Sequence, residues 1–384
     1  MLDVIVAEEH DNIKMVAGLN KGRLAELVVH DAAKANEGDV YLGKIVKKIS
    51  TANGKNSYFV NIGKKDVFIN AHENELEDLE AHEGQDIVLQ IAQEARAEKN
   101  ARGLRFLQLA GDNVVFCPYG DGVNISSKIE NEELRNNLSE LVSKNLSEDD
   151  GGWIVRTHAA EALSDEIISE MGELRKVFAD IMAKAKSGKS PECLYSKDNS
   201  LSDMISRNMT TLCKIVVNNH NIEREFADTG IVEYNANAFD EYGIDEQIGE
   251  ALQKEVKLKC GGRIFVEETK ALTAIDVDSG GCSGQGGINR LNNEAAEEIA
   301  KQIILRNLSG KIVIDFAGFT EFRFLKDALD ILEQGLQDDA AKSRVLGVTK
   351  AGNVEILRSR RRPSLSYIFM KECDVCQGTG RVEK

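Results

Sequence analysis

The sequence predicts an α+β protein of several subdomains, among them a small β-barrel and a unit in which strands and helices alternate. Three observations predict this class. The 384 residues exceed what one hydrophobic core usually serves. Short apolar stretches recur at close spacing between about residues 36 and 115, as in a small barrel. From residue 260 onward, strand-like and helix-like patterns alternate.

The first part of the chain is expected to be β-structure. Residues 1–35 contain three short strand-like stretches: MLDVIVAEE, KMVAGLN and RLAELVVHD. Residues 36–115 contain five more, separated by Gly and Asn: GDVYLGKIVKKI, NSYFVNIG, KDVFIN, DIVLQIAQEA and RFLQLAG. Several short strands with turn residues between them predict the barrel in this second region.

The middle of the chain is expected to be mainly helical. Between residues 116 and 200 we predict one strand, GWIVRTH, followed by a long helical stretch from about 159 to 187. A further helix is predicted from Leu201 to about Asn218. A mixed, acidic segment with few turn signals then leads to about residue 258.

The last third of the chain has the clearest pattern. GRIFVEE and ALTAIDVD are predicted strands, and NNEAAEEIAKQIILRNLSG is a predicted helix, capped by Asn292 or Asn293 and followed by Gly310. KIVIDF is the next strand, FRFLKDALDILEQGL the next helix, and RVLGVT and NVEILR are strands. A strand, a helix and a strand in succession form a βαβ unit, so ALTAIDVD and KIVIDF are expected to be parallel.

Charge and composition limit the function classes. A formal net charge of −16 argues weakly against nucleic acid as a partner. Two basic clusters argue for it: the lysines between residues 44 and 65, and RSRRR at 358–362. The N-terminus resembles no secretion signal, and no apolar run approaches 18 residues. Seven scattered cysteines argue against a disulfide framework, so we expect a reducing cytoplasm.

Three aspartates end the two predicted parallel strands. Asp276 and Asp278 are two residues apart and share a strand face, and Asp315 ends KIVIDF. Parallel strands end at the same edge of a sheet, where open α/β sheets place their ligands. Clustered carboxylates without His or Cys suit a hard cation such as Mg²⁺, which activates water and stabilises charge on a phosphate. The alternative is that these aspartates only start turns.

These motifs resemble the ribonuclease E/G family of bacterial endoribonucleases. ALTAIDVDSG is similar to the family's metal motif, and NNEAAEEIAKQIILRNLSGKIVIDF to the helix and strand that lead to its second metal aspartate. CDVCQGTGR, near the end, is similar to its zinc-link motif. The resemblance covers nearly the whole chain in the right order. It implies a short form of the enzyme, without a C-terminal scaffold region for partner enzymes.

The resemblance implies a division into subdomains. Residues 1–35 and 200–259 would form a ribonuclease-H-like subdomain, interrupted by an S1 RNA-binding domain of OB type at 36–115. A 5′-sensor region would follow at 116–199, a DNase-I-like α/β catalytic subdomain at 260–370, and the zinc-link at 371–384.

The resemblance also implies roles for individual residues. Asp276 and Asp315 would hold Mg²⁺, with Asp278 assisting catalysis. RNA would be bound by Phe59, Phe68, Lys99, Arg156 and Thr157. The two phenylalanines would stack on bases, although their spacing alone also fits a role in the barrel core. Lys99 matches a position at the RNA channel, and WIVRT is similar to the sensor that grips an RNA 5′-monophosphate, with Arg156 as a bidentate fork and Thr157 as a hydroxyl donor.

Two cysteines imply assembly. Cys373 and Cys376 supply only two thiolates, whereas structural zinc requires four ligands. The family shares one zinc between two chains, which implies a homodimer and leaves a tetramer open. The alternative is a CxxC pair that binds no metal.

The sequence departs from the family pattern at four places. Asp278 stands where the family usually has asparagine, and Gly318 where it usually has a second aspartate. HAAEA follows Arg156–Thr157, where a glycine-containing loop is usual. Asp374 replaces a common proline. The first two put metal affinity in doubt, and the third puts 5′-end sensing in doubt.

Three functions therefore compete. The first is a Mg²⁺-dependent endoribonuclease that cuts single-stranded RNA in rRNA or mRNA processing and leaves a 5′-phosphate and a 3′-hydroxyl. The second is an S1-type RNA-binding protein of the same family that has lost cleavage. The third is a zinc-linked assembly scaffold. Asp276 and Asp315 favour the enzyme, and Gly318 favours the second function.

Overall fold

The computed structural model describes residues 1–50, 56–70, 81–96, 99–148, 150–196, 198–282, 287–318, 322–337 and 339–376, together with 378, 380 and 382. The chain forms two compact units. The first comprises Met1–Glu9, Met15–Val28 and Cys213–Lys384, and the second His10–Lys14 and Val29–Leu212. In the part of the chain that is described, no helix is both long and apolar enough to cross a membrane.

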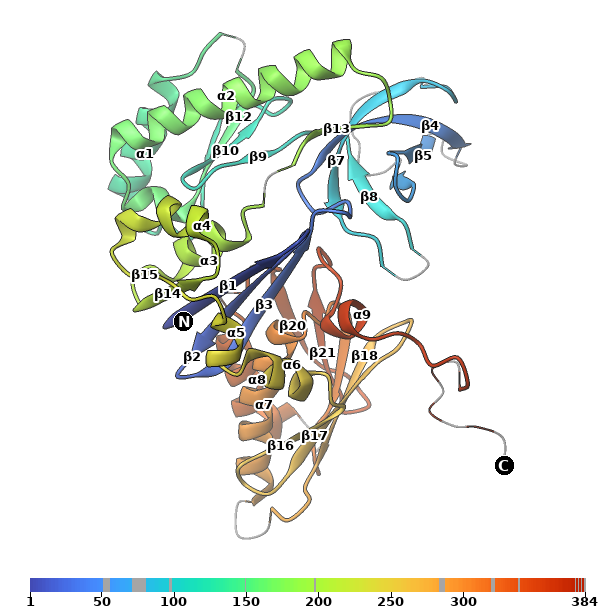
Figure 1. Ribbon diagram of the computed structural model, residues 1–384. Coiled ribbons are helices and arrows are strands. Elements are labelled where there is room, and N and C mark those ends of the chain that lie inside the picture. The colour runs from blue at the N-terminus through green and yellow to red at the C-terminus, as the bar shows by residue number, and fades with distance from the viewer. Residues whose placement is uncertain are drawn as a thin grey trace. The chain divides into compact units, whose positions relative to one another are not determined.

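The first unit contains an N-terminal sheet with strand order β15-β14-β1-β2-β3 (Figure 1). Its strands are β1 (Val4–His10), β2 (Ile13–Asn20), β3 (Arg23–Asp31), β14 (Lys214–Val217) and β15 (Val232–Tyr234). The first three are the strands expected in residues 1–35. β1 pairs with β14 in parallel, which joins segments that lie about 200 residues apart in the sequence. The short helices nearby are α4 (His220–Glu225), α5 (Ala238–Glu241), α6 (Ile244–Ala251) and the 3₁₀ helix η2 (Ala227–Thr229).

One predicted helix is wrong in its second half. α3 covers only Ser200–Asn208, and the apolar run that follows it forms β14 instead. Ile215, Val216 and Val217 are β-branched and buried, and they pair with β1 on one side and β15 on the other. A short apolar run of this kind fits a buried strand as well as a helix, and only its pairing partners decide.

The second unit contains the predicted barrel. Its strands are β4 (Val40–Ser50), β5 (Asn56–Asn61), β6 (Val67–Ile69), β7 (Asp86–Gln93) and β8 (Ala101–Leu104). Their order is β4-β5-β6-β8-β7, and the pairing of β4 with β7 closes the ring. A further strand, β13 (Glu192–Tyr195), pairs with β4 in antiparallel orientation. A closed five-stranded barrel is consistent with the expected S1/OB type. The last strand lies at 101–104 and not at the expected 105–111, of which only Leu109–Ala110 is a strand.

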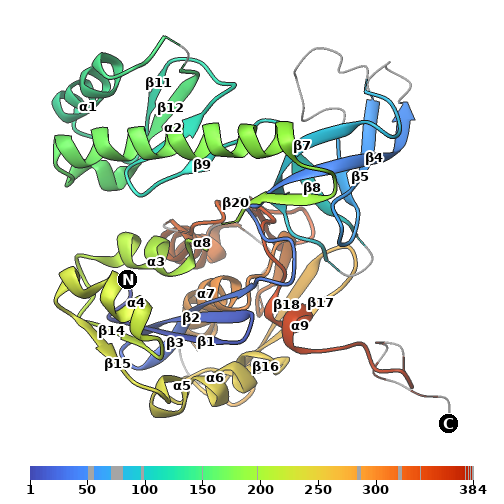
Figure 2. The same ribbon diagram turned by 45° about the horizontal axis from the view of Figure 1, so that its top comes forward.

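The remainder of the second unit is richer in strands than the sequence indicated (Figure 2). Its four-stranded sheet contains β9 (Leu109–Ala110), β10 (Val114–Cys117), β11 (Val123–Ile125) and β12 (Gly152–Val155). β12 matches its prediction and β9 is the end of the predicted stretch 105–111, whereas β10 and β11 are additional. The helices are α1 (Glu132–Lys144), the 3₁₀ helix η1 (Thr157–Ala160) and α2 (Ser164–Ser187). The core of this part is centred on Trp153, which is fully buried and stacks on Phe116 with ring centroids 4.5 Å apart.

The C-terminal sheet of the first unit follows the predicted alternation. Its strands are β16 (Glu255–Lys257), β17 (Arg263–Glu268), β18 (Thr273–Asp278), β19 (Gly310–Asp315), β20 (Ser343–Val348) and β21 (Val354–Arg358), in the order β16-β17-β18-β19-β21-β20. The helices are α7 (Gly287–Leu305), α8 (Phe322–Leu336) and α9 (Leu365–Phe369). β18 and β19 are parallel, as predicted.

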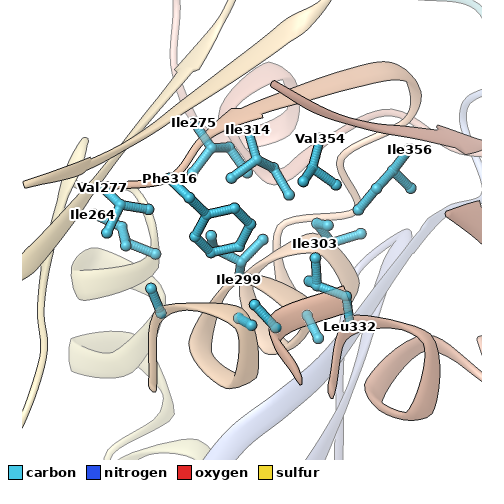
Figure 3. Close-up of a cluster of buried hydrophobic side chains, with 14 of the residues drawn as sticks. Ile264, Ile275, Val277, Ile299, Ile303, Ile314, Phe316, Leu332, Val354 and Ile356 are labelled. Atoms are coloured by element: carbon cyan, nitrogen blue, oxygen red, sulfur yellow. The ribbon is translucent and has the colours of Figure 1, made fainter. Parts of the chain in front are cut away.

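Alternation along the strands decides which face is buried. Every second side chain along these strands, for example Ile275, Ile314 and Val354, points to one face and is buried against α7 and α8. Figure 3 shows Ile314 on the strand side of this cluster, facing Ile303 and Leu332 of the helices. The side chains between these buried ones on β17, β18 and β19 point to the opposite face and are exposed or half-buried. We call this the outer face of the sheet.

The predicted caps of α7 are wrong. The helix is described from Gly287, so Asn292 and Asn293 lie within it. Asn292 is 1% exposed, and its amide accepts from the backbone N–H of Ala317 (3.1 Å) and donates to the Ala317 carbonyl (3.0 Å). Asn292 therefore fixes the loop that follows Asp315. At the other end, α7 stops at Leu305, and Asn307, at φ 50°, takes the left-handed conformation expected of Gly310, which instead begins β19.

Candidate active site and RNA interface

Asp276 and Asp315 lie side by side on the outer face of the C-terminal sheet. The parallel register of β18 and β19 makes them direct partners, so one strand spacing of about 4.8 Å separates their backbones. Their neighbours Ile275, Val277 and Ile314 point to the opposite face and are buried. Both carboxylates are exposed. The fold thus holds two acidic side chains together at the carboxyl ends of two parallel strands.

Electrostatics show that this pairing is unfavourable without a counter-charge. Partial desolvation by the neighbouring side chains, together with the negative charges of Asp315 and Asp278, raises the pKa of Asp276 above its ordinary value, although the residue as a whole is exposed. The exposed position of Asp276 keeps solvent screening strong, so the effect is modest. A bound cation would remove the repulsion, because it would give both carboxylates an opposite charge.

A shallow pocket of about 300 Å³ opens beside the two aspartates. Its lining includes Asp276, Asp315, Asn353, Phe265 and Glu267. The last three did not stand out in the sequence, because their place at the site depends on strand pairing. Phe265 faces Asp276 across the antiparallel pair β17–β18. Asn353 directly precedes β21, which runs antiparallel to β19.

Asp278 lies one step further along β18, where its carboxylate already has partners. One oxygen accepts the backbone N–H of Gly280 at 2.7 Å, which is a turn-forming contact. The other lies 3.5 Å from Nη2 of Arg263, its register partner on β17. These contacts give Asp278 a local structural role, and its catalytic role stays a prediction.

The residues at the pocket suit a hard cation only in part. Within the described ranges, no group of three or more His, Cys, Asp or Glu side chains is close enough to hold a metal ion. Two carboxylates and the amide oxygen of Asn353 are nevertheless the oxygen ligands that Mg²⁺ accepts, and Mg²⁺ commonly completes its shell with waters and substrate phosphates. The donor set therefore fits a magnesium ion that shares its coordination with RNA.

Gly318 adopts a backbone conformation that suits glycine. Its φ is +75°, and a Cβ placed there would lie 3.0 Å from Cδ1 of Ile288. An aspartate at this position would be strained, because L-residues avoid positive φ. The loop after Asp315 is therefore shaped for the residue that this chain has.

The barrel presents an aromatic pair on its outside. Phe59 and Phe68 are register partners on β5 and β6, with ring centroids 5.2 Å apart. Both are half-buried, whereas Tyr58 and Val60 beside Phe59 are buried in the barrel core. The interpretation that both rings fill the core is therefore wrong.

Basic residues flank this aromatic pair. Lys47 is the partner of Phe59 on β4, and Arg102 is the partner of Phe68 on β8. The order Lys47, Phe59, Phe68 and Arg102 runs across four strands of the barrel. Aromatic rings between cationic side chains are typical of surfaces that bind single-stranded nucleic acid.

Lys99 lies at the tip of the β7–β8 hairpin. Its backbone bonds reciprocally with Arg96, with N···O distances of 2.8 and 3.1 Å, and its side chain is exposed. The structure therefore leaves Lys99 accessible, and its contact with RNA stays a prediction.

Arg156 and Thr157 follow β12 directly. The guanidinium of Arg156 donates to the Gly111 carbonyl and to Asp203, whose carboxylate is 3.2 Å away. The side chain is 31% exposed. Thr157 begins η1, and its hydroxyl lies 3.1 Å from that of Ser126. Arg156 is thus held in a fixed orientation by partners that include a carboxylate.

Cys373 and Cys376 lie in the segment after α9, and neither is in a disulfide. Hydrogen bonds from the backbone N–H groups of Cys376 and Val375 lower the pKa of Cys373. N–H groups directed at a cysteine sulfur favour its thiolate, which is the form that binds metal. The donor set fits half of a tetrahedral zinc site.

Comparison with known proteins gives a consistent result. The model of the ribonuclease E/G family matches residues 108–361. The chain is 31% identical to ribonuclease G of Haemophilus influenzae, over 97% of this chain and 82% of that protein. It is 28% identical to ribonuclease G of Escherichia coli K12, over 96% and 82%. It is also 30% identical to ribonuclease E of a Nostoc species, over 98% of this chain and 58% of that longer protein.

Proposed function

This chain belongs to the ribonuclease E/G family, and from this premise we propose that it is an endoribonuclease that uses Mg²⁺ to cut single-stranded RNA in rRNA and mRNA processing and decay. The products would carry a 5′-phosphate and a 3′-hydroxyl. The observation that supports the proposal most is the pairing of Asp276 with Asp315 on the outer face of the C-terminal sheet.

In the proposed reaction Asp276 and Asp315 would hold the metal ion at the place where the RNA phosphate binds. The bound metal would supply an activated water and would neutralise charge on the phosphate. Asn353 lines the same pocket, where its amide oxygen can accept from a water and its amide N–H can donate to a phosphate oxygen. Asp278 assists by holding Arg263 next to the site.

We propose that the row Lys47, Phe59, Phe68 and Arg102 binds the RNA strand on the barrel. The two rings would stack on bases, and the flanking cations and Lys99 would contact phosphates. Such a local row of basic side chains would allow a protein with a net charge of −16 to bind RNA, because the local charge beside the rings is positive.

A 5′-monophosphate would be bound by Arg156 and Thr157. Arg156 is oriented by the Gly111 carbonyl, and Asp203 is the partner that an RNA phosphate would displace or share. The RNA phosphate would compete with the existing ion pair between Arg156 and Asp203. The preference for monophosphorylated ends would therefore be smaller than that of an enzyme whose sensor arginine has no carboxylate partner.

Zinc shared by Cys373 and Cys376 of two chains would make the protein a homodimer, and pairs of dimers would make a tetramer. We place the protein in a reducing cytoplasm, because its seven cysteines are scattered through the sequence and do not have the spacing of a disulfide framework.

The second candidate is an RNA-binding protein of this family with weakened or lost cleavage. It is favoured by Gly318, whose backbone does not suit a third carboxylate, and by the lack of a three-member metal-binding group among the described residues.

A Mg²⁺ titration of RNA cleavage separates the two candidates. Wild type should cut a single-stranded oligonucleotide, whereas Asp276→Asn and Asp315→Asn should lose most activity at every Mg²⁺ concentration. Asp278→Asn should retain measurable cleavage and require more Mg²⁺. If wild type cuts at no concentration of Mg²⁺ or Mn²⁺, the protein is the RNA-binding member. If the Asp276 and Asp315 variants cut like wild type, the metal site lies elsewhere.

A further inference from the structure

We propose that Phe265 is a stacking platform for the nucleobase next to the scissile phosphate, so that the pocket on the outer face is a nucleotide subsite. The inference rests on the proposed function, because it takes the Asp276–Asp315 pair as the place where the phosphate binds. It assigns a binding role to a residue outside the metal-binding and barrel sets.

The first observation that supports the proposal is the position of Phe265. It is the register partner of Asp276, which is the partner of Asp315, so the three residues form a row across β17, β18 and β19. The backbone of Phe265 therefore lies one strand spacing, about 4.8 Å, from that of Asp276, and both side chains are on the outer face. A phosphate held by that pair would leave an adjoining base within reach of the ring.

The second observation is the exposure of Phe265. Its neighbours Ile264 and Val266 are buried in the core, whereas Phe265 points to the outer face and is half-buried. Its ring lines the pocket of about 300 Å³. This volume is at the lower end of the range for small-molecule sites, about 300–1,000 Å³, and suits a single nucleotide.

The third observation is the surroundings of the ring. The guanidinium of Arg263 lies over the ring, with Cζ 5.3 Å from its centroid. Arg263 is itself held by Asp278 at 3.5 Å and by Glu255 at 3.6 Å. The charge of Arg263 is thus compensated, and its contact orients the ring. An oriented aromatic surface beside two carboxylates suits the flat face of a base, which stacks without regard to sequence.

A double-mutant cycle between protein and RNA tests the proposal. Cleavage in Mg²⁺ would be measured for wild type and Phe265→Leu, each with an intact oligonucleotide and with one that lacks the base on either side of the scissile bond. For a stacked base, removal of the ring should lower kcat/KM roughly 5- to 150-fold on intact RNA. On the abasic RNA that has lost the stacked base, Phe265→Leu should cause no further loss.

Controls keep the outcome decisive. Phe265→Tyr keeps the ring and should cut like wild type, and Phe265→Val replaces Phe265→Leu if circular dichroism shows that the leucine variant is misfolded. The stacking role would be overturned if wild type and Phe265→Leu cut intact RNA at equal rates. It would also be overturned if Phe265→Leu lowered kcat/KM by the same factor on abasic RNA as on intact RNA. Failure of the proposed function would look different, because wild-type protein would then not cut the intact RNA at all, or Asp276→Asn would cut it normally.

Discussion

Replacing Asp276 by asparagine should stabilise the metal-free protein. Asp276 and Asp315 are register partners about 4.8 Å apart, and two unit charges at that distance repel by about 0.9 kcal/mol at the dielectric constant of water. Asp278, about 7 Å along the same strand, adds about 0.6 kcal/mol. We therefore expect Asp276→Asn to raise the free energy of unfolding in EDTA, at low salt and neutral pH, by up to about 1.5 kcal/mol.

The gain should depend on pH and on Mg²⁺. The pKa of Asp276 is raised in the folded state, so the native protein is favoured when this group is protonated and loses that advantage as the pH rises through the folded pKa. The advantage of the variant should therefore vanish below the ordinary Asp value of 3.8. Mg²⁺ at a hundredfold excess over its Kd stabilises wild type by about 2.7 kcal/mol, and each tenfold loss of affinity removes about 1.4 kcal/mol of that.

Urea denaturation followed by circular dichroism, with and without Mg²⁺, measures both effects. Saturating Mg²⁺ should remove or reverse the advantage of Asp276→Asn. The matched control is Asp327→Asn on the exposed side of α8, which should respond little to either condition. If Asp276→Asn is less stable than wild type in EDTA, or if Mg²⁺ stabilises both proteins equally, the two aspartates do not form a metal site.

Four further outcomes are expected. Phe59→Ala should weaken binding of single-stranded RNA by about tenfold or more in fluorescence anisotropy, and unchanged affinity in a folded variant would rule out stacking. Arg156→Ala should slow cleavage of 5′-monophosphorylated RNA more than that of 5′-hydroxyl RNA; equal slowing would show that Arg156 is no sensor. Cys373→Ser should release zinc and give monomers in native mass spectrometry, where wild type should carry one zinc per dimer and a zinc-free dimer would refute the link. Gly318→Asp should lower the urea midpoint by an amount corresponding to about 1 kcal/mol, because φ is +75°, and an unchanged midpoint would show that the loop relaxes.

The strongest part of the sequence-based prediction is the C-terminal sheet. Its strands alternate buried and exposed side chains, and α7 and α8 repeat apolar residues at helical spacing, so local pattern and final structure agree. The parallel pairing that brings Asp276 beside Asp315 followed from the βαβ order alone.

The errors lie where tertiary contacts decide. The four residues of β14 were predicted as the end of a helix, because an apolar run this short shows neither a helical nor a strand period. Their pairing with β1 and β15 makes them a strand. Asn292 resembled a helix cap, but a buried contact with Ala317 uses its side chain. Phe265 and Asn353 carry no local signal, because strand register places them at the pocket. The division into named subdomains stays a prediction, as do the roles of the site residues.

The central claim is metal-dependent cleavage by the Asp276–Asp315 pair, and mapping the ends of RNA products tests it most directly. A 5′-monophosphorylated, AU-rich single-stranded oligonucleotide would be incubated with wild type and with Asp315→Asn, with Mg²⁺ or with EDTA. We predict internal fragments with 5′-phosphate and 3′-hydroxyl ends, formed only by wild type and only with Mg²⁺. Fragments formed in EDTA or at an equal rate by Asp315→Asn would contradict the account, as would RNA that is bound by wild type but left uncut with Mg²⁺.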